Sequence, residues 1–137
     1  MKKILCLLVL SLASASLRAQ TVDTDLAFAI SQLQSSGPGP FAKALYGIDE
    51  EGVRQLAERM AVCAKDAGAA LSYEMLSRRF IAQKVERIYL VIYFEKRPVF
   101  LRVDSYASPK GRLFLSAIVS REAVDVIPLE AVNPAGH

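Results

Sequence analysis

The residues of this chain that could do chemistry lie close together, between positions 89 and 114. They are aromatic residues with one arginine and one aspartate: Tyr89, Tyr93, Phe100, Arg102, Asp104, Tyr106 and Phe114. If their side chains share one face of a curved sheet, they form an apolar site with a few polar groups, the usual form of a small-ligand site. In such a site Asp104 could act as a base, with Arg102 or a tyrosine stabilising the negative charge that develops.

The same residues also have a purely structural interpretation, and the sequence favours it. Arg102 and Asp104 are two positions apart on a predicted strand, and side chains at that spacing pair readily without a ligand. The tyrosines would then pack across neighbouring strands. The face that they form would be solvated or would meet a second copy of the chain.

Most catalytic constellations are absent from the sequence. The single histidine is the terminal His137, which excludes histidine-activated nucleophiles and multi-histidine metal sites. The sequence contains no glycine-rich phosphate loop and no Cys-x-x-Cys. Cys63 falls on the apolar face of a predicted helix, where burial as a small hydrophobic residue is favoured. We therefore expect no metal and no cofactor, and the sequence favours a non-catalytic protein without deciding the point.

The strands that would position the candidate residues are predicted to form an antiparallel meander. Alternating runs cover residues 87–94, 99–106 and 112–120, with turn residues between them. Each run has one aliphatic face and one mixed face of aromatic and polar residues, and we expect Phe114 on the mixed face. Residues 71–83 fit a strand or a helix, and we favour a strand paired with 87–94.

Helices are predicted to cover the aliphatic face of this sheet. Residues 49–67 carry an apolar stripe at helical spacing, with Asp49 placed to cap the start and Gly68 to close the end. Residues 21–34 form a first helix, and 41–48 are expected to be a connector with at most one helical turn. The predicted fold class is α+β, with N-terminal helices packed on a curved antiparallel sheet of about four strands.

The N-terminus has the layout of a secretory signal peptide. Lys2 and Lys3 precede an apolar run over residues 4–12, which is shorter than the ~20 residues of a membrane-spanning helix. Small residues allow cleavage after Ala15 or after Ala19. We therefore expect an exported protein, periplasmic or secreted, that meets the membrane only through its transient signal peptide.

This assignment divides the chain into three parts. A signal peptide covers 1–19, a single α+β domain covers 20–128, and a frayed tail covers 129–137. The whole chain has 17 basic and 14 acidic residues, a net charge of +3. The first 19 residues contain three basic residues and no acidic one, so the mature chain is neutral and gives no reason to expect nucleic acid as a partner.

Several positions in the second half of the chain match a family pattern. They are Gly68, Ser72-Tyr73-Glu74, Arg79, Ile88-Tyr89-Leu90, Tyr93-Phe94-Glu95 with Pro98, and Tyr106 followed by Gly111-Arg112-Leu113. In these positions the chain resembles small exported bacterial proteins with a nuclear transport factor 2-like (SnoaL-like) fold. The resemblance implies helices packed into the concave side of a bent antiparallel sheet, often dimerised through that sheet. The superfamily includes cyclases, isomerases, dehydratases and many members without activity, and the catalytic His-Asp pairing of the enzymes has no histidine here.

The sequence thus favours an exported, non-catalytic domain that binds a small apolar ligand or a protein partner, with a homodimer through the sheet as one form. The alternative is a cyclase-, isomerase- or dehydratase-type enzyme. It would use Asp104 with Arg102 and Tyr106 in a pocket on the concave sheet face. A structural factor of the cell envelope is a third class that the sequence does not separate from the first.

Overall fold

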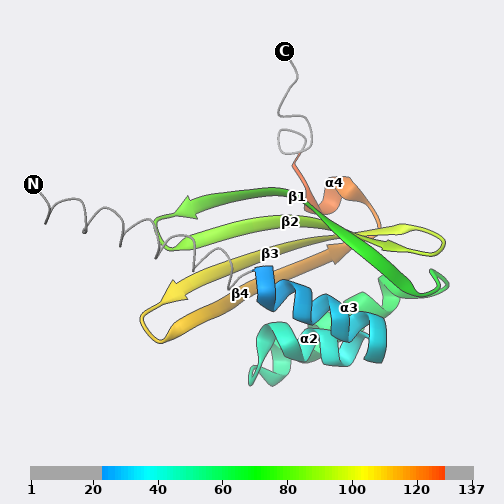
Figure 1. The fold of residues 1–137 in the computed structure, drawn as a ribbon, viewed down its shortest axis with the longest axis horizontal. Coiled ribbons are helices and arrows are strands. Elements are labelled where there is room, and N and C mark those ends of the chain that lie inside the picture. Colours follow the sequence, from blue (N-terminus) through cyan, green and yellow to red (C-terminus); the bar gives the residue numbers. More distant parts are fainter. Residues whose placement is uncertain (1–22, 129–137) are drawn as a thin grey trace, which may run out of the picture.

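A computed structural model describes residues 23–128 of the chain as a layer of helices on an antiparallel sheet. A helix over 23–36 is followed by α2 (Pro38–Tyr46), α3 (Glu50–Ala64), β1 (Ala70–Ala82), β2 (Val85–Phe94), β3 (Pro98–Ser108), β4 (Gly111–Ser120) and α4 (Ala123–Val126). The strands pair in the order β1-β2-β3-β4. The three N-terminal helices lie on one side of the twisted sheet and α4 lies on the other (Figure 1).

This architecture confirms the predicted α+β class and the predicted strand at 71–83, which pairs with β2 along its length. The predicted signal peptide and the predicted tail at 129–137 lie outside the described residues.

The main core forms between the helices and the aliphatic face of the sheet. Its fully buried members come from both layers: Leu26, Ile30, Phe41, Leu56 and Met60 from the helices, and Ile88, Leu90, Ile92, Val99, Leu101 and Val103 from the strands. Burying each such side chain contributes roughly 1.5–3 kcal/mol. The prediction that the aliphatic face meets the helices is confirmed for β2 and β3, whereas Leu113 and Leu115 of β4 are exposed.

The helix α3 begins where the sequence predicts. The Asp49 carboxylate accepts a hydrogen bond from the Gly52 amide at 3.1 Å. The helix ends at Ala64, earlier than predicted, and Asp66 then takes a left-handed conformation with φ of 58°. Gly68 follows with φ of 83°, and a Cβ there would lie 2.1 Å from a Glu95 carboxylate oxygen. Gly68 is therefore required for the turn into β1, although it does not close the helix itself.

Residues 38–46 form a full helix where the sequence predicts mainly a connector. Pro38 stands at the first position of α2, where its missing amide hydrogen has no helical partner to lose. Gly37, with φ of 94°, makes the sharp junction with the preceding helix. The prolines thus start this helix, and Phe41 and Leu45 of α2 are buried in the core.

A bulge in β4 corrects the prediction for Phe114. Asp104 pairs with Ser116, whereas Ser105 pairs with Phe114, so Leu115 is an extra residue between the two pairs. The residues before the bulge therefore change face. Phe114 packs against the helix-side core, and the prediction that it lies with the tyrosines was wrong.

A buried ionic cluster closes the core where the helix over 23–36 meets the sheet. Glu86 of β2 is only 6% exposed and pairs with Arg78 of β1 and with Arg112 of β4. Arg78 also binds Asp23 at 2.8 Å, and Arg112 donates to the Ser105 hydroxyl at 2.8 Å. The cluster therefore joins the first helix to β1, β2 and β4.

Replacing Glu86 with alanine should lower the free energy of unfolding by about 3–5 kcal/mol, because two arginines lose the carboxylate that they share. Urea unfolding followed by circular dichroism measures this loss. Glu58→Ala is the matched control, since Glu58 pairs with Arg54 on the exposed surface of α3. The control should change stability by less than about 1 kcal/mol. Equal losses in the two variants would contradict the role given to Glu86.

Candidate functional site

The sheet face opposite the helices carries most of the predicted site residues. The register of β2 and β3 places Tyr89, Tyr93, Phe100, Arg102, Asp104 and Tyr106 on this mixed face. Tyr89 lies opposite Arg102 in this register, and Val91 lies opposite Phe100. The prediction that these residues share a face is confirmed for all of them, while Phe114 lies on the other side.

The apolar part of the mixed face is filled by the chain itself. Tyr89 is 1% exposed and packs with Val126 and Ile127, and Phe100 and Ile118 join the same cluster. These contacts form because α4 folds back over this side of the sheet (Figure 1). The sequence analysis missed α4; its signal is the pair of apolar residues that follows the polar stretch at 120–122. Tyr89 and Phe100 thus belong to a second small core.

The polar part of the mixed face is organised by one ion pair. Arg87 binds both carboxylate oxygens of Asp104, with Nε–Oδ1 at 2.7 Å and Nη2–Oδ2 at 2.8 Å. Ser116 donates to Oδ2 at 3.3 Å. The partner of Asp104 is therefore Arg87 on the neighbouring strand, and the predicted pairing with Arg102 was wrong. The hydrogen bonds from Arg87 hold the pKa of Asp104 below its ordinary value, which makes this carboxylate a weak base.

The ion pair should make stability depend on pH. Because the pKa of Asp104 is lowered in the folded state, the pair stabilises the fold above about pH 4 and loses its effect as the pH falls through the folded-state pKa. Asp104→Asn should lower the free energy of unfolding by about 2 kcal/mol at pH 7, and the difference should shrink towards pH 2. Urea unfolding at several pH values measures both. Asp66→Asn, at an exposed loop residue, is the control. A difference that does not change with pH would contradict this account.

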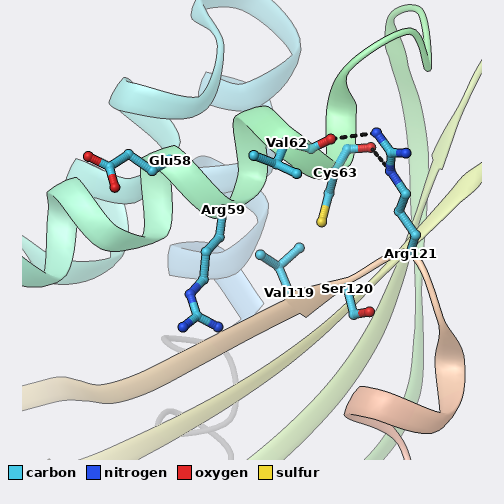
Figure 2. Close-up of a pocket in the computed structure, with 7 residues that line it drawn as sticks. All are labelled: Glu58, Arg59, Val62, Cys63, Val119, Ser120 and Arg121. Atoms are coloured by element: carbon cyan, nitrogen blue, oxygen red, sulfur yellow. Dashed lines mark hydrogen bonds between the residues drawn. The ribbon is translucent and has the colours of Figure 1, made fainter.

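A hollow of about 520 Å³ lies between α3 and the end of β4 (Figure 2). It is lined by Glu58, Arg59, Val62, Cys63, Val119, Ser120 and Arg121. Arg121 donates to the carbonyl oxygens of Val62, Cys63 and Lys65 at the C-terminal end of α3. Its guanidinium therefore ties α3 to the sheet and is already engaged.

Cys63 does not give this hollow a nucleophile. The side chain is buried, as the sequence predicts, and burial raises the pKa of its thiol. The thiol therefore stays protonated at neutral pH and reacts weakly.

Within residues 23–128, no three His, Cys, Asp or Glu side chains gather closely enough to hold a metal ion. The helices of this part of the chain lack the length and apolar character that crossing a membrane requires.

Each outer strand of the sheet receives one hydrogen bond to its backbone from outside the sheet within residues 23–128. At the β4 edge the Ala117 amide donates to the Tyr46 hydroxyl at 2.8 Å, and α3 packs alongside. At the β1 edge, the described part of the chain sends one hydrogen bond to the strand backbone from outside the sheet, from Gln34 Nε2 to the Leu71 carbonyl at 3.0 Å. Most of the β1 edge is therefore open, and open edges readily pair with another strand.

The open edge is also rich in exposed apolar side chains. Five residues of β1 contribute, with exposed fractions of 58% for Leu71, 39% for Tyr73, 37% for Leu76, 70% for Phe80 and 45% for Ile81. Exposed apolar side chains are a common feature of protein interaction surfaces. The sequence analysis did not single out these residues, because it assigned 71–83 to a strand without deciding which of its side chains the helices cover. The helices leave most of the side chains of β1 exposed.

Comparisons with protein-family models, curated proteins and solved structures gave no match to this chain. The function has to be inferred from the geometry of residues 23–128.

Proposed function

We propose that the chain is an exported, non-catalytic interaction domain that binds a protein partner along β1. The open β1 edge, with its five exposed large apolar side chains, carries this proposal. A partner strand can pair with the free backbone groups of such an edge while its side chains cover the apolar residues. At the other edge, α2 and α3 contact β4, and the Tyr46 hydroxyl binds the Ala117 amide near the middle of that strand.

A protein partner fits better than a small apolar ligand. A ligand on the mixed face needs access to Tyr89 and Phe100, and both pack in the cluster that contains Val126 and Ile127. A cyclase-, isomerase- or dehydratase-type reaction has less support, because both carboxylate oxygens of Asp104 are bound by Arg87.

Export and kinship with the nuclear transport factor 2-like superfamily belong to the same proposal. Export is supported by Lys2 and Lys3, the apolar run over 4–12 and the small residues that follow. Kinship is supported by helices that precede an antiparallel sheet, the order that the resemblance implies. The domain would then work in the periplasm or outside the cell.

Export predicts a shortened chain. When the full-length protein is produced in a bacterial host, intact mass spectrometry of the exported fraction should find a chain that lacks residues 1–15 or 1–19. Leu8→Arg, which places a charge in the apolar run, should keep the protein uncleaved in the cytoplasm. A full-length natural chain confined to the cytoplasm would contradict export.

Binding along β1 predicts where cross-links form. A photo-crosslinking phenylalanine analogue at position 80 should give a defined covalent adduct in the cells that make the protein. The same analogue at Leu113 is the matched control, because Leu113 is 55% exposed on β4, the opposite outer strand of the sheet, and should give none. Leu76→Lys should abolish the adduct from position 80, since it places a charge at the centre of β1. No adduct from position 80, or equal adducts from both positions, would rule out the proposal.

A further inference from the structure

We infer that the partner of β1 is a second copy of this chain, paired antiparallel to β1 about a two-fold axis between Leu76 and Ser77. This inference rests on the proposed function and names the partner. It follows from the faces of β1, from its charges and from the room that the helices leave beside it.

The strand β1 changes face at its middle. Its helix-side residues are Tyr73, Met75, Arg78 and Phe80, and those on the opposite side are Ser72, Glu74, Ser77 and Arg79. Met75 pairs with Leu90, and Ser77 pairs with the next residue of β2, Tyr89, so Leu76 is the extra residue of a bulge. The alternation of faces therefore slips by one residue at Leu76.

This slip restricts what can pair with the whole of β1. Directly opposite residues of an antiparallel pair point to the same face. A regular strand that matches the faces of β1 up to Met75 is therefore out of phase from Ser77 onwards. A second copy carries the same slip. Its faces match those of β1 on both sides of the bulge when Leu76 of one copy lies opposite Ser77 of the other.

The charges of β1 select this register over its neighbours. Registers centred on Glu74 or on Arg78 also match the faces, but they set like charges directly opposite each other, which is destabilising. A register with Met75 opposite Leu76 matches the faces and leaves Glu74 opposite a serine. With Leu76 opposite Ser77, Glu74 of each copy lies opposite Arg79 of the other, and the two-fold axis forms this ion pair twice.

Arg79 is an arginine without a carboxylate partner in the described part of one copy. It lies opposite Arg87 in the pairing of β1 with β2, and its guanidinium carbon is 6.0 Å from the centre of the Tyr89 ring. No ion pair joins it to an acidic residue within residues 23–128. Glu74 is exposed and accepts a hydrogen bond from the Tyr93 hydroxyl at 2.8 Å. Glu74 of the second copy would supply the carboxylate that pairs with the Arg79 guanidinium.

The helix side of β1 has matching apolar residues and room for them. The same register sets Tyr73 opposite Phe80, and these side chains are 39% and 70% exposed in one copy. The helix over 23–36 runs beside β1, since Gln34 binds Leu71 and Asp23 binds Arg78. The exposure of Tyr73 and Phe80 shows that this helix leaves the outer part of β1 uncovered. Two such pairs, related by the axis, would bury the apolar residues of both strands.

Self-pairing about a two-fold axis also closes the assembly. Each copy uses the same surface, so two copies satisfy each other and no further copy is added. The two four-stranded sheets become one sheet whose outer strands are the two β4 strands. At each of these outer strands the Tyr46 hydroxyl binds the Ala117 amide and α3 packs alongside.

Charge exchange tests the pairing directly. The mature chain should sediment as a dimer in analytical ultracentrifugation over a concentration series. Glu74→Arg and Arg79→Glu should each weaken dimerisation at least about tenfold, since each sets like charges opposite twice. The chain with both substitutions should return to within a few-fold of the natural affinity. Glu58→Arg, on exposed α3, is the control and should leave the dimer unchanged. A natural chain that stays monomeric, or a double variant that stays weakened, would overturn the inference.

Engineered disulfides test the register. In a Cys63→Ala background, Tyr73→Cys with Phe80→Cys should give disulfide-linked dimers on mild oxidation. Tyr73→Cys with Arg78→Cys, which face each other in the register with Met75 opposite Leu76, should give none. Dimers linked only through the second pair would overturn the register.

The photo-crosslinking experiment separates this inference from the proposed function. An adduct from position 80 with twice the mass of the chain, together with a dimer in solution, supports both. An adduct with a different protein, together with a monomeric pure chain, overturns self-pairing and keeps β1 as the binding surface. A monomeric chain without any adduct overturns both.

Discussion

The structure depends on β2 being buried on both faces. Ile88, Leu90 and Ile92 face the helices, while Tyr89 and Val91 face the other way, and all of them are at most 2% exposed. An antiparallel sheet commonly has one solvated face, so burying both faces of a strand requires two covers. The helices provide one cover, and the short segment that carries Val126 and Ile127 lies over Tyr89 as part of the other. Within residues 23–128 these covers leave much of β1 exposed.

The ionic contacts follow the same division between a covered and an open side. Arg121 and Tyr46 hold α3 and α2 against β4, through the helix-end carbonyls and the Ala117 amide. On the other side, Asp23 and Gln34 hold the first helix beside β1 without covering its outer backbone. Within residues 23–128 the helix layer is thus tied to both outer strands of the sheet, and the outer backbone of β1 receives one such hydrogen bond.

Local patterns predicted the elements of this fold, and non-local pairings decided what they missed. Alternation and helical spacing are properties of single segments, so the strands, α3 and the aliphatic face followed from the sequence. The bulges at Leu76 and Leu115 did not, because they depend on the partner strand and have no marker residue of their own. Phe114 was placed on the wrong face for this reason. The partner of Asp104 and the cover over Tyr89 likewise required the register and the path of the last residues.

The Arg87–Asp104 ion pair also affects the charges on β1. Because Arg87 uses both oxygens of Asp104, that carboxylate is not free to pair with Arg79, the next arginine across the sheet. The pair that fixes β2 against β3 thereby leaves an excess positive charge on β1. An exposed Arg79 without a carboxylate partner costs the domain little folding free energy, since exposed charges are well solvated. In the proposed pairing, Glu74 of the second copy lies on the same face as Arg79 and brings a carboxylate to it.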